Sequence, residues 1–589
     1  MNSCYLKIEI LIVLFIGFLC PLVSSSQLEI SDSKAFVSRI VDVKTHEAIP
    51  YANVYNLSAE KGTISNFEGL FTLRRSLPSD SIRISFIGYE TLYFLLAEIV
   101  EKDTIYLKTR TELLSELRIY GDYAFLYDLF AKAAKTTNNK ELKAKTYFSL
   151  ETFIDTVQVE WLEGYYNGIY KGYEMDDLNL KNGRIALVPN GLKYFVSLES
   201  SKAQYMHRIF EFNAHYPKSP FEFSKKKTKE NFDLKLANSY KDDEDKTIIV
   251  VDFKPKLDSS LFYSGRVWLD SLSGNVQKVS LHCYNAQVHP YSPIWANDNL
   301  IQVDLFFVKT FKKVKDKMYV DAIDYTYNLK YENWKKERYQ VSTHNMLFAY
   351  DYTTAFDLPL FDFGLNEEND YRKVNTAPYN AFFWEFIDEF TRYDRSENNK
   401  KFILKASKDD EVVFLGNNDV MNHLFSRSYL YWSEERLRFD ESGMKFHNDD
   451  VKSVLATDMY KIEMQIYLDI NYLNDSLQCI SKTIFDPFDS YYYFLPDNKS
   501  AAFLNMYFDF VEIQRLKMDE ALKKADGSAQ KAKRIYKNKM VELGRLSVAF
   551  FRDVNRGNDK EGMLKWNDYI VKGLGIDNWE IFELFYEFD

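Results

Sequence analysis

The longest regular feature of the sequence is an alternation of hydrophobic and polar residues from about Tyr147 to Tyr352. It is clearest at Ile323–Tyr331, where every second side chain is hydrophobic and the residues between are mostly polar. Successive side chains of a strand point to opposite faces, so the pattern predicts strands with one buried and one solvated face. Residues 270–275 carry turn chemistry between two such segments, which favours an antiparallel pairing. We therefore predict an antiparallel β-sheet domain over residues 141–357.

The spacing changes to three and four residues after Pro359 and Gly364. Helical spacing begins near Asn380 and is unambiguous after Ser500, with Gly527-Ser528 supplying a helix stop and a new N-cap. We predict a mostly helical C-terminal domain over residues 358–589. The hydrophobic positions at this spacing are Phe382, Phe383, Phe386 and Phe390, then Phe503, Met506, Phe510, Ile513 and Leu516, then Tyr536, Met540, Leu543, Leu546 and Phe550.

A shorter helical pattern precedes the alternating region. Asp122 can cap a helix that runs to about Thr136 and ends at Asn138-Asn139. We predict that residues 111–140 form a linking helix. Before it, the segment Phe36–Leu107 reads as short strands separated by turn signals. This pattern predicts a small β-sandwich over residues 27–110, so that the whole chain is multidomain and α+β.

Several motifs of the predicted sandwich are distinctive: Ser38–Asp42, Ile49–Val54, Gly62–Asn66 with Gly69 and Phe71, and Ile82–Tyr89. Together they resemble the carboxypeptidase-regulatory-like domain, a transthyretin-like sandwich of bacterial envelope proteins. The resemblance implies a stability or docking module without catalytic residues, although Ser38 stands where the family usually has glycine. The middle block also resembles, by its alternation, the curved antiparallel sheet of periplasmic lipoprotein carriers.

Residues 1–26 have the layout of a cleavable signal peptide, with an early Lys7, an apolar stretch and three serines. Cys20 lacks the small preceding residues that lipoprotein processing favours, so we expect cleavage before Gln27 and an unlipidated mature chain. The protein is then exported, and resides in the periplasm or in association with the outer membrane. In an oxidising compartment Cys283 and Cys479 could pair, and the sequence leaves open whether they do or remain two buried thiols.

The chain has 589 residues, 46% of them hydrophobic, which indicates a globular protein of about three or four domains. Its net charge of −11 arises from mixed acids and bases and argues against nucleic acid as a partner. The only dense basic run is Lys225–Lys229, which we interpret as a solvated loop.

Three well-marked catalytic motifs are missing from the sequence. No His-Glu-x-x-His, Gly-x-Ser-x-Gly or Gly-x-x-x-x-Gly-Lys-[Ser/Thr] occurs, so the corresponding metalloprotease, hydrolase and phosphate-loop mechanisms lack support. A glycosidase needs only two carboxylates, and a site of that kind would leave no mark in the sequence. We therefore nominate no catalytic, cofactor-binding or metal-binding residue.

Two clusters could in principle hold a metal. His282, Cys283 and His289 lie close together, but the first two are adjacent on a predicted strand and face opposite sides, which argues against zinc. A second cluster offers hard oxygen ligands for calcium, but it lacks the glycine and terminal glutamate of an EF-hand loop and reads as a polar turn. The second cluster comprises Asp469, Asn471, Asn474 and Asp475.

A third cluster joins Tyr491–Tyr493 with Asp486 and Asp489 and could stack on a sugar or peptide, although packing in a sheet or core explains it better. Our leading hypothesis is a non-enzymatic envelope protein that binds another envelope protein, a peptide or a glycan. One alternative is a hydrolase of envelope polymer or glycan with an unmarked carboxylate site. Another is a periplasmic domain preceding an outer-membrane barrel, which the helical C-terminal pattern disfavours.

Overall fold

The computed structural model forms two compact units, the first built from residues 36–86 and 91–107, and the second from most of the remainder. The residues described lie between 36 and 588. Excepted are 67, 74–75, 100–101, 111–122, 136–139, 188–199, 258, 294, 362–373, 375–379, 381–382, 385–428, 447–458, 474–475 and 526.

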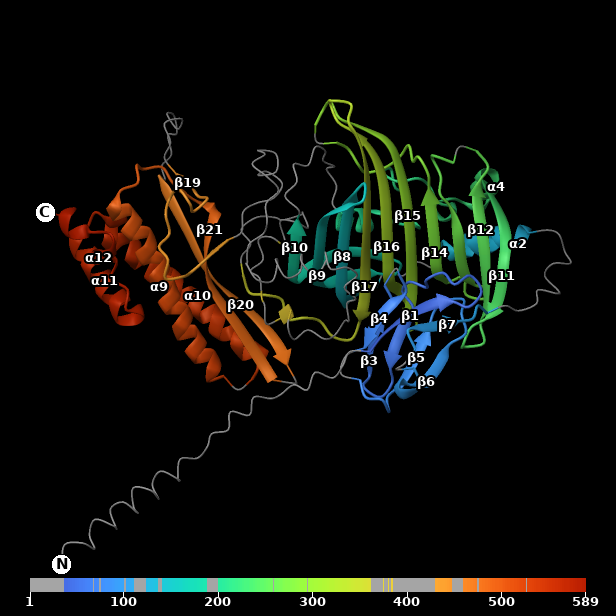
Figure 1. Cartoon of the computed structure of the whole chain (residues 1–589), viewed down its shortest axis with the longest axis horizontal. Coiled ribbons are helices and arrows are strands. Elements are labelled where there is room, and N and C mark those ends of the chain that lie inside the picture. Colours follow the sequence, from blue (N-terminus) through green and yellow to red (C-terminus); the bar gives the residue numbers. More distant parts are fainter. Residues whose placement is uncertain are drawn as a thin grey trace, which may run out of the picture. The chain divides into compact units, whose positions relative to one another are not determined.

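The first unit is a β-sandwich, shown in blue in Figure 1. One sheet has the order β4-β1-β7 and the other the order β3-β2-β5-β6. Ile82 and Ile84, which lie two residues apart on the same strand, are fully buried between the two sheets. The elements are β1 (Phe36–Asp42), β2 (Asn53–Asn56), β3 (Lys61–Ile64), β4 (Leu70–Leu73), β5 (Ser81–Ser85), β6 (Leu92–Leu95), η1 (Leu96–Glu98) and β7 (Thr104–Leu107).

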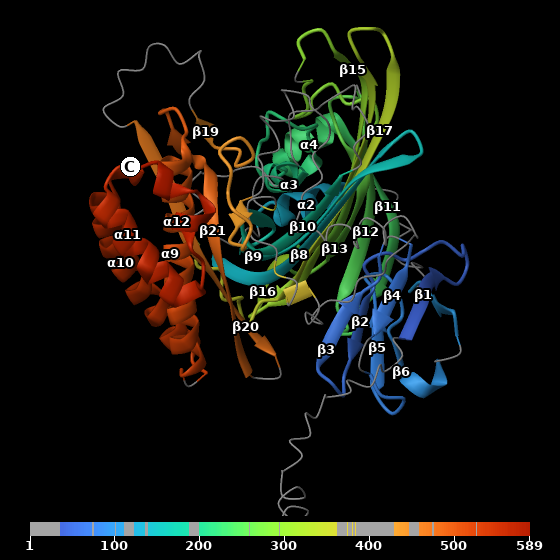
Figure 2. The same cartoon turned by 60° about the vertical axis from the view of Figure 1, so that its left-hand side comes forward.

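The second unit contains, in its described part, a ten-stranded sheet with the order β10-β9-β8-β17-β16-β15-β14-β13-β12-β11, every neighbouring pair being antiparallel (Figures 1 and 2). The predicted antiparallel sheet is therefore confirmed. The strands are β8 (Glu141–Ile154), β9 (Val157–Lys171), β10 (Glu174–Leu187), β11 (Phe232–Lys241), β12 (Thr247–Pro255), β13 (Ser264–Asp270), β14 (Val276–Cys283), β15 (Asn299–Val314), β16 (Lys317–Glu332) and β17 (Arg338–Asp351).

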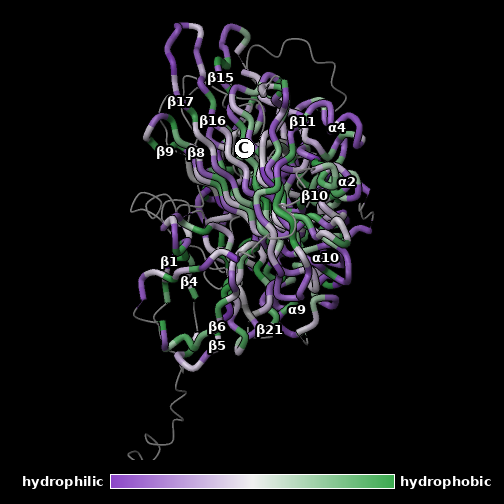
Figure 3. Tube along the Cα trace, turned by 90° about the vertical axis from the view of Figure 1, so that its right-hand side faces the viewer, coloured by the Kyte–Doolittle hydropathy of each residue, from purple (hydrophilic) through white to green (hydrophobic). Residues whose placement is uncertain are grey.

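One face of this sheet is buried and the other is partly solvated, and hydropathy alternates accordingly along the strands (Figure 3). On β16 the hydrophobic side chains from Ile323 to Tyr331 all face the buried side. Short helices pack on that side, and Phe130 stacks on Phe221 with ring centroids 5.0 Å apart. The helices are α2 (Ala124–Ala133), α3 (Ser200–Met206), η2 (Pro220–Glu222) and α4 (Lys225–Asn231).

The C-terminal part combines helices with a long hairpin that the sequence analysis did not predict. Strands β20 (Tyr460–Leu473) and β21 (Ser476–Tyr492) pair along their whole length, and β18 (Leu430–Tyr431) and β19 (Lys445–Phe446) join β21. The predicted helices after Ser500 are confirmed, and Ser528 caps the second by accepting a hydrogen bond from the Lys531 N–H. The helices are α9 (Asn498–Lys523), α10 (Ala529–Val554), η3 (Asn555–Gly557), α11 (Lys560–Leu574), α12 (Asn578–Ile581) and η4 (Leu584–Tyr586).

Aromatic side chains form the seam between these helices. Phe510 of α9 is fully buried, with its ring centroid 5.8 Å from that of Phe550 and 5.3 Å from that of Trp566. Leu516, the last member of the same predicted stripe, is 38% exposed and lies off the buried face, which continues to Met518 and Leu522. Among the described residues, no helix is both long and apolar enough to cross a membrane.

Some predicted features lie outside the described residues. They are the signal peptide 1–26, the capping Asp122, the helix end at Asn138-Asn139, and the positions Phe382, Phe386, Phe390, Asn474 and Asp475.

Candidate functional site

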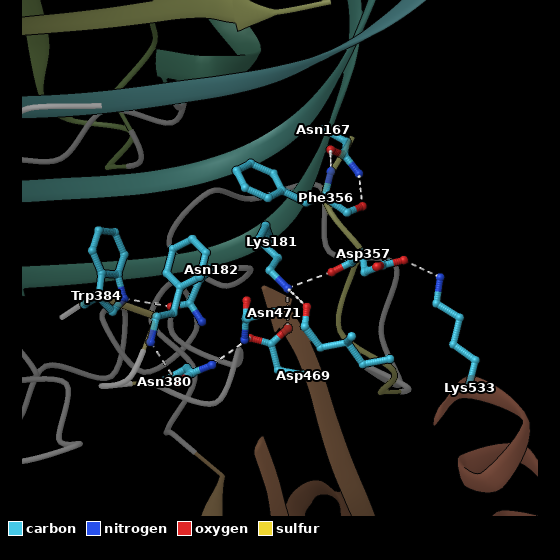
Figure 4. Close-up of polar contacts among 12 residues, drawn as sticks. Asn167, Lys181, Asn182, Phe356, Asp357, Asn380, Trp384, Asp469, Asn471 and Lys533 are labelled. Atoms are coloured by element: carbon cyan, nitrogen blue, oxygen red, sulfur yellow. Dashed lines mark hydrogen bonds and ion pairs between the residues drawn. The ribbon is translucent and has the colours of Figure 1, made fainter. Parts of the chain in front are cut away.

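A buried ion pair lies where the hairpin meets the ten-stranded sheet. Lys181 is the extra residue of a β-bulge in β10, between Leu180 and Asn182, which pair with Tyr166 and Tyr165 of β9. A bulge redirects a side chain out of the regular alternation. Here it accompanies a lysine that points away from the sheet toward Asp469 of β20 (Figure 4).

The ammonium of Lys181 has three donors, and each of them is used. Its Nζ donates to Asp469 Oδ1 at 2.5 Å and to the carbonyl oxygens of Asp357 at 2.7 Å and Ile470 at 2.9 Å. The other carboxylate oxygen of Asp469 accepts from the side-chain amides of Asn380 at 2.6 Å and Asn471 at 3.1 Å. The pair is therefore fully hydrogen-bonded within the protein.

Burial lowers the pKa of Lys181, and the neighbouring Asp469 carboxylate opposes that shift. A lysine with a lowered pKa is a common nucleophile. At this position, however, the side chains of Lys181 and Asp469 are 1% and 0% exposed, and every donor is engaged. The arrangement fixes the hairpin against the sheet and leaves no free lone pair for chemistry.

Aromatic and charged side chains surround this pair. Trp384 donates from Nε1 to Asn182 Oδ1 at 2.7 Å, and the Arg184 guanidinium lies 4.2 Å from the centroid of a Trp384 ring. Arg184 also pairs with buried Glu163 at 2.9 Å. The described part of the segment around Asn380 and Trp384 is thus bound to both the sheet and the hairpin.

A second buried ion pair holds a connecting segment on the hydrophobic face of the ten-stranded sheet. Lys309 of β15 donates to the His207 carbonyl at 2.5 Å, while Glu174 of β10 accepts from the Ile209 N–H at 3.0 Å. The Lys309 Nζ and Glu174 Oε2 atoms are 3.7 Å apart. Burial raises the pKa of Glu174 and lowers that of Lys309. Both charges therefore anchor the backbone at 207–209.

The anchored segment brings His207 into an aromatic column. The ring of His207 stacks on Phe307, and Phe307 stacks on Tyr325, with centroids 3.9 Å apart in both cases. Burial, followed by the charge of Lys309, lowers the pKa of His207 well below its usual value, so the imidazole is neutral. Tyr216 and Tyr263 meet the same ring edge-on. The space between the ten-stranded sheet and the segment around His207 is therefore filled by side chains from both.

His344 lies on the opposite, partly solvated face. Its Nε2 is 3.2 Å from Asp324 Oδ1 and its Nδ1 is 3.8 Å from Glu151 Oε1. Burial disfavours the charged imidazole, but the two carboxylates outweigh it and raise the pKa of His344 to about 9. At neutral pH this histidine is a cation and cannot act as a general base.

The residues considered for metal binding do not come together. Cys283 is buried and its Sγ donates to the carbonyls of Ser259 and Ser260, whereas the adjacent His282 faces the other side of β14. Cys283 and Cys479 are both free thiols, which answers the question of pairing. In the described part of the chain, no group of three or more His, Cys, Asp or Glu side chains is arranged to hold a metal.

Two interpretations of local structure were wrong. Asp469 and Asn471 lie in strand β20, not in a polar turn, because alternate hydrophobic neighbours pack on the helices while Asp469 meets Lys181. Lys225–Lys229 lie in helix α4, not in a loop, although these lysines are exposed as expected. Tyr492 is buried in the C-terminal core, and Tyr491 stacks on Tyr493 with centroids 5.0 Å apart.

The sandwich can now be compared with known families. Residues 39–118 match the model of the CarboxypepD_reg-like domain. The first unit is a CarboxypepD_reg-like domain. Within this domain Ser38 is 2% exposed, and its hydroxyl donates to the Lys102 carbonyl at 3.1 Å. The buried hydroxyl of this serine therefore has a backbone partner.

Gly69 is required by the backbone of the CarboxypepD_reg-like domain. Its φ is +76°, a region that L side chains rarely adopt. A Cβ atom there would lie 2.2 Å from the Ile40 carbonyl oxygen. The glycine of the sequence motif therefore permits close approach of the loop before β4 to strand β1.

The solved structures that match this chain are only distantly similar to it. MucB of Pseudomonas aeruginosa, solved in complex with MucA, has a TM-score of 0.15 at 8% identity and covers 38% of this chain and 92% of its own. A LolA superfamily protein of Nitrosomonas europaea has a TM-score of 0.15 at 12% identity and covers 37% of this chain and 91% of its own. A putative outer membrane lipoprotein-sorting protein domain of Vibrio parahaemolyticus has a TM-score of 0.18 at 13% identity and covers 43% of this chain and 98% of its own. TM-scores of this size do not establish a shared fold. The comparison with curated proteins gives no match.

Proposed function

We propose that this chain is an exported envelope protein without catalytic activity, which binds another envelope protein, a peptide or a glycan. The proposal rests on the use of the buried ionisable groups in the second unit. Lys181, Lys309 and Arg184 are each paired with a buried carboxylate and each support the packing of one segment on another. Because these charged groups stabilise the fold, we assign partner binding to the surfaces of the sheet and the C-terminal helices. The CarboxypepD_reg-like domain supports an envelope location.

Site-specific crosslinking in the exported full-length chain tests this proposal. A photoreactive residue replaces Asn328 on the partly solvated face of β16, or the exposed Val541 on α10. A discrete adduct from either position, absent when the group replaces the exposed Leu95 of the first unit, is the expected result. If neither position gives an adduct and the purified protein releases sugars or peptides from envelope polymer, the hydrolase alternative is correct.

Export has its own measurement. The mature protein recovered from the envelope fraction should begin at or near Gln27 and carry no lipid. A diacylated Cys20 at the mature N-terminus would contradict the proposed processing.

A further inference from the structure

The two ends of the ten-stranded sheet differ in chemistry. At one end lie the connections 256–263, 284–298 and 333–337 and the segment 210–231, which we call the loop end. It exposes Phe212, Leu257, Trp295 and Trp334, which are 72%, 74%, 42% and 64% exposed. The opposite end, formed by 242–246, 271–275 and 315–316, is largely charged or polar. In the described part of those turns, Leu272 is the exposed large hydrophobic side chain.

Direct contacts connect the segments of the loop end into one surface. Each segment is hydrogen-bonded to its neighbour, and Lys218 lies 5.2 Å from the ring centroid of exposed Phe212. The exposed hydrophobic side chains are therefore held at one end by the packing of their own loops. The contacts between segments are Lys218 N to Leu261 O at 3.0 Å, Gln287 N to Ser260 O at 3.0 Å, and Trp334 N to Asp298 Oδ1 at 2.8 Å.

The basic run of the sequence lies at this same end. Helix α4 leads into β11, whose first residue pairs with Pro255 beside the loop end, and Figures 1 and 2 show α4 and the β16–β17 turn at one end of the sheet. Thr228 of α4 faces the core, so Lys226, Lys227 and Lys229 face solvent. Among the described residues these three lysines form no ion pair, whereas Lys225 pairs with Asp128.

We propose that the loop end is a peripheral binding surface for an anionic lipid bilayer. Isolated exposed hydrophobic residues are ordinary, but several at the tips of successive connections mark an interaction site. The exposed hydrophobic side chains of the loop end lie on separate connections, an arrangement compatible with insertion between lipid head groups. Tryptophan favours the interface between water and lipid, and clustered lysines attract anionic head groups. Leu257 and Trp334 then enter the head-group region while the α4 lysines lie against phosphates.

Vesicle sedimentation of the mature full-length protein tests the proposal, which does not depend on the partner discussed above. We expect binding to vesicles of phosphatidylglycerol and phosphatidylcholine, little binding to phosphatidylcholine alone, and weakening by salt. The double variant Leu257→Asp, Trp334→Asp should lower the bound fraction by about tenfold or more. Leu272→Asp, at the opposite end, is the matched control and should bind like the parent.

A separate pair of variants tests whether the lysines of α4 contribute to binding of anionic lipid. Lys226→Glu with Lys227→Glu should reduce anionic binding by about tenfold and remove most of its salt dependence, whereas exposed Lys313→Glu with Lys315→Glu at the opposite end should not. Unchanged near-ultraviolet circular dichroism verifies that each variant is folded. Absence of vesicle binding by the parent, or equal losses from both ends, would overturn the proposal. The proposal would also be overturned if the parent did not bind vesicles but formed a crosslinked protein adduct that was lost in the Leu257→Asp variant.

Discussion

Lys181 is a single extra residue in strand β10, and this bulge accompanies the burial of its ammonium group against Asp469. Removing one member of a buried ion pair leaves the other charge uncompensated in a medium that solvates it poorly. Exposed pairs behave differently, since water solvates either partner that remains. The chain offers both kinds, so the two situations can be compared in one protein.

Lys181→Met should lower the free energy of unfolding by roughly 3 to 5 kcal/mol, because it leaves the fully buried Asp469 carboxylate without its cation. The double variant with Asp469→Leu should recover most of that loss. Urea unfolding followed by fluorescence measures both. Lys108→Met, which removes the exposed pair with Glu90, is the control and should cost less than about 1 kcal/mol. A single variant as stable as this control would refute the assigned role.

His344 makes stability depend on pH. Its folded pKa of about 9 lies above the usual value of 6.5, so its contribution is complete below pH 6.5 and is lost as pH rises through 9. The loss is on the order of 3 kcal/mol. Denaturant unfolding at a series of pH values should show this decline, and His344→Gln should flatten it. A decline of the same size in that variant would assign the effect to other groups.

Local sequence decides which of these residue-scale features can be predicted. Adjacent His282 and Cys283 had to face opposite sides of a strand, and they do. Lys181 and Asp469 are separated by 288 positions, and the bulge that aims Lys181 has no local signature. No spacing rule connects residues so far apart, so their pairing could only come from the tertiary structure.

At the scale of elements, the β20–β21 hairpin shows a signal that was present and overlooked. From Lys461 to Asn471 hydrophobic and polar residues largely alternate, the period of a half-buried strand. The even positions from Ile462 to Ile470 pack in the C-terminal core with the helices. The prediction of a mostly helical domain over residues 358–589 did not include this hairpin. The helices after Ser500 were predictable because their stripes are long and their caps local.

The seam between α9 and the helices beside it should be the most sensitive part of the C-terminal region. Phe510→Asp places an unpaired charge among Tyr507, Phe550 and Trp566, and should cost several kcal/mol or prevent folding. Leu516→Asp changes a partly exposed side chain of the same helix that lies off the buried face, and should cost about 1 kcal/mol or less. Soluble yield and thermal melting compare the two. Equal melting temperatures would mean that the seam is not packed as described.

At the scale of the whole molecule, the chain divides into a small unit and a large one with separate cores. The α+β class and the order of sandwich, antiparallel sheet and C-terminal helices followed from periodicity and turn chemistry. The attachment of the hairpin to the sheet did not, because it uses buried polar contacts that periodicity does not encode. Buried polar contacts of this kind specify one arrangement among several that hydrophobic packing would allow.

We predict that residues 27–110 fold without the rest of the chain. Their two sheets enclose a core of their own, and the turns between strands are internal to the segment. A module of this size buries enough apolar surface to be marginally stable. The isolated fragment should therefore show a β-type circular dichroism spectrum and unfold cooperatively in urea. A helical or disordered spectrum would refute this boundary.

Ile84→Asp provides the decisive comparison, because Ile84 is fully buried in the small sandwich. A charge at that position should unfold the isolated fragment, whose marginal stability cannot absorb several kcal/mol. In the full-length chain the same substitution should abolish only the unfolding transition of the sandwich and leave that of the second unit in place. Calorimetry of parent and variant separates the two transitions. If Ile84→Asp instead lowers the melting of the entire chain as one transition, the sandwich depends on the second unit for its fold.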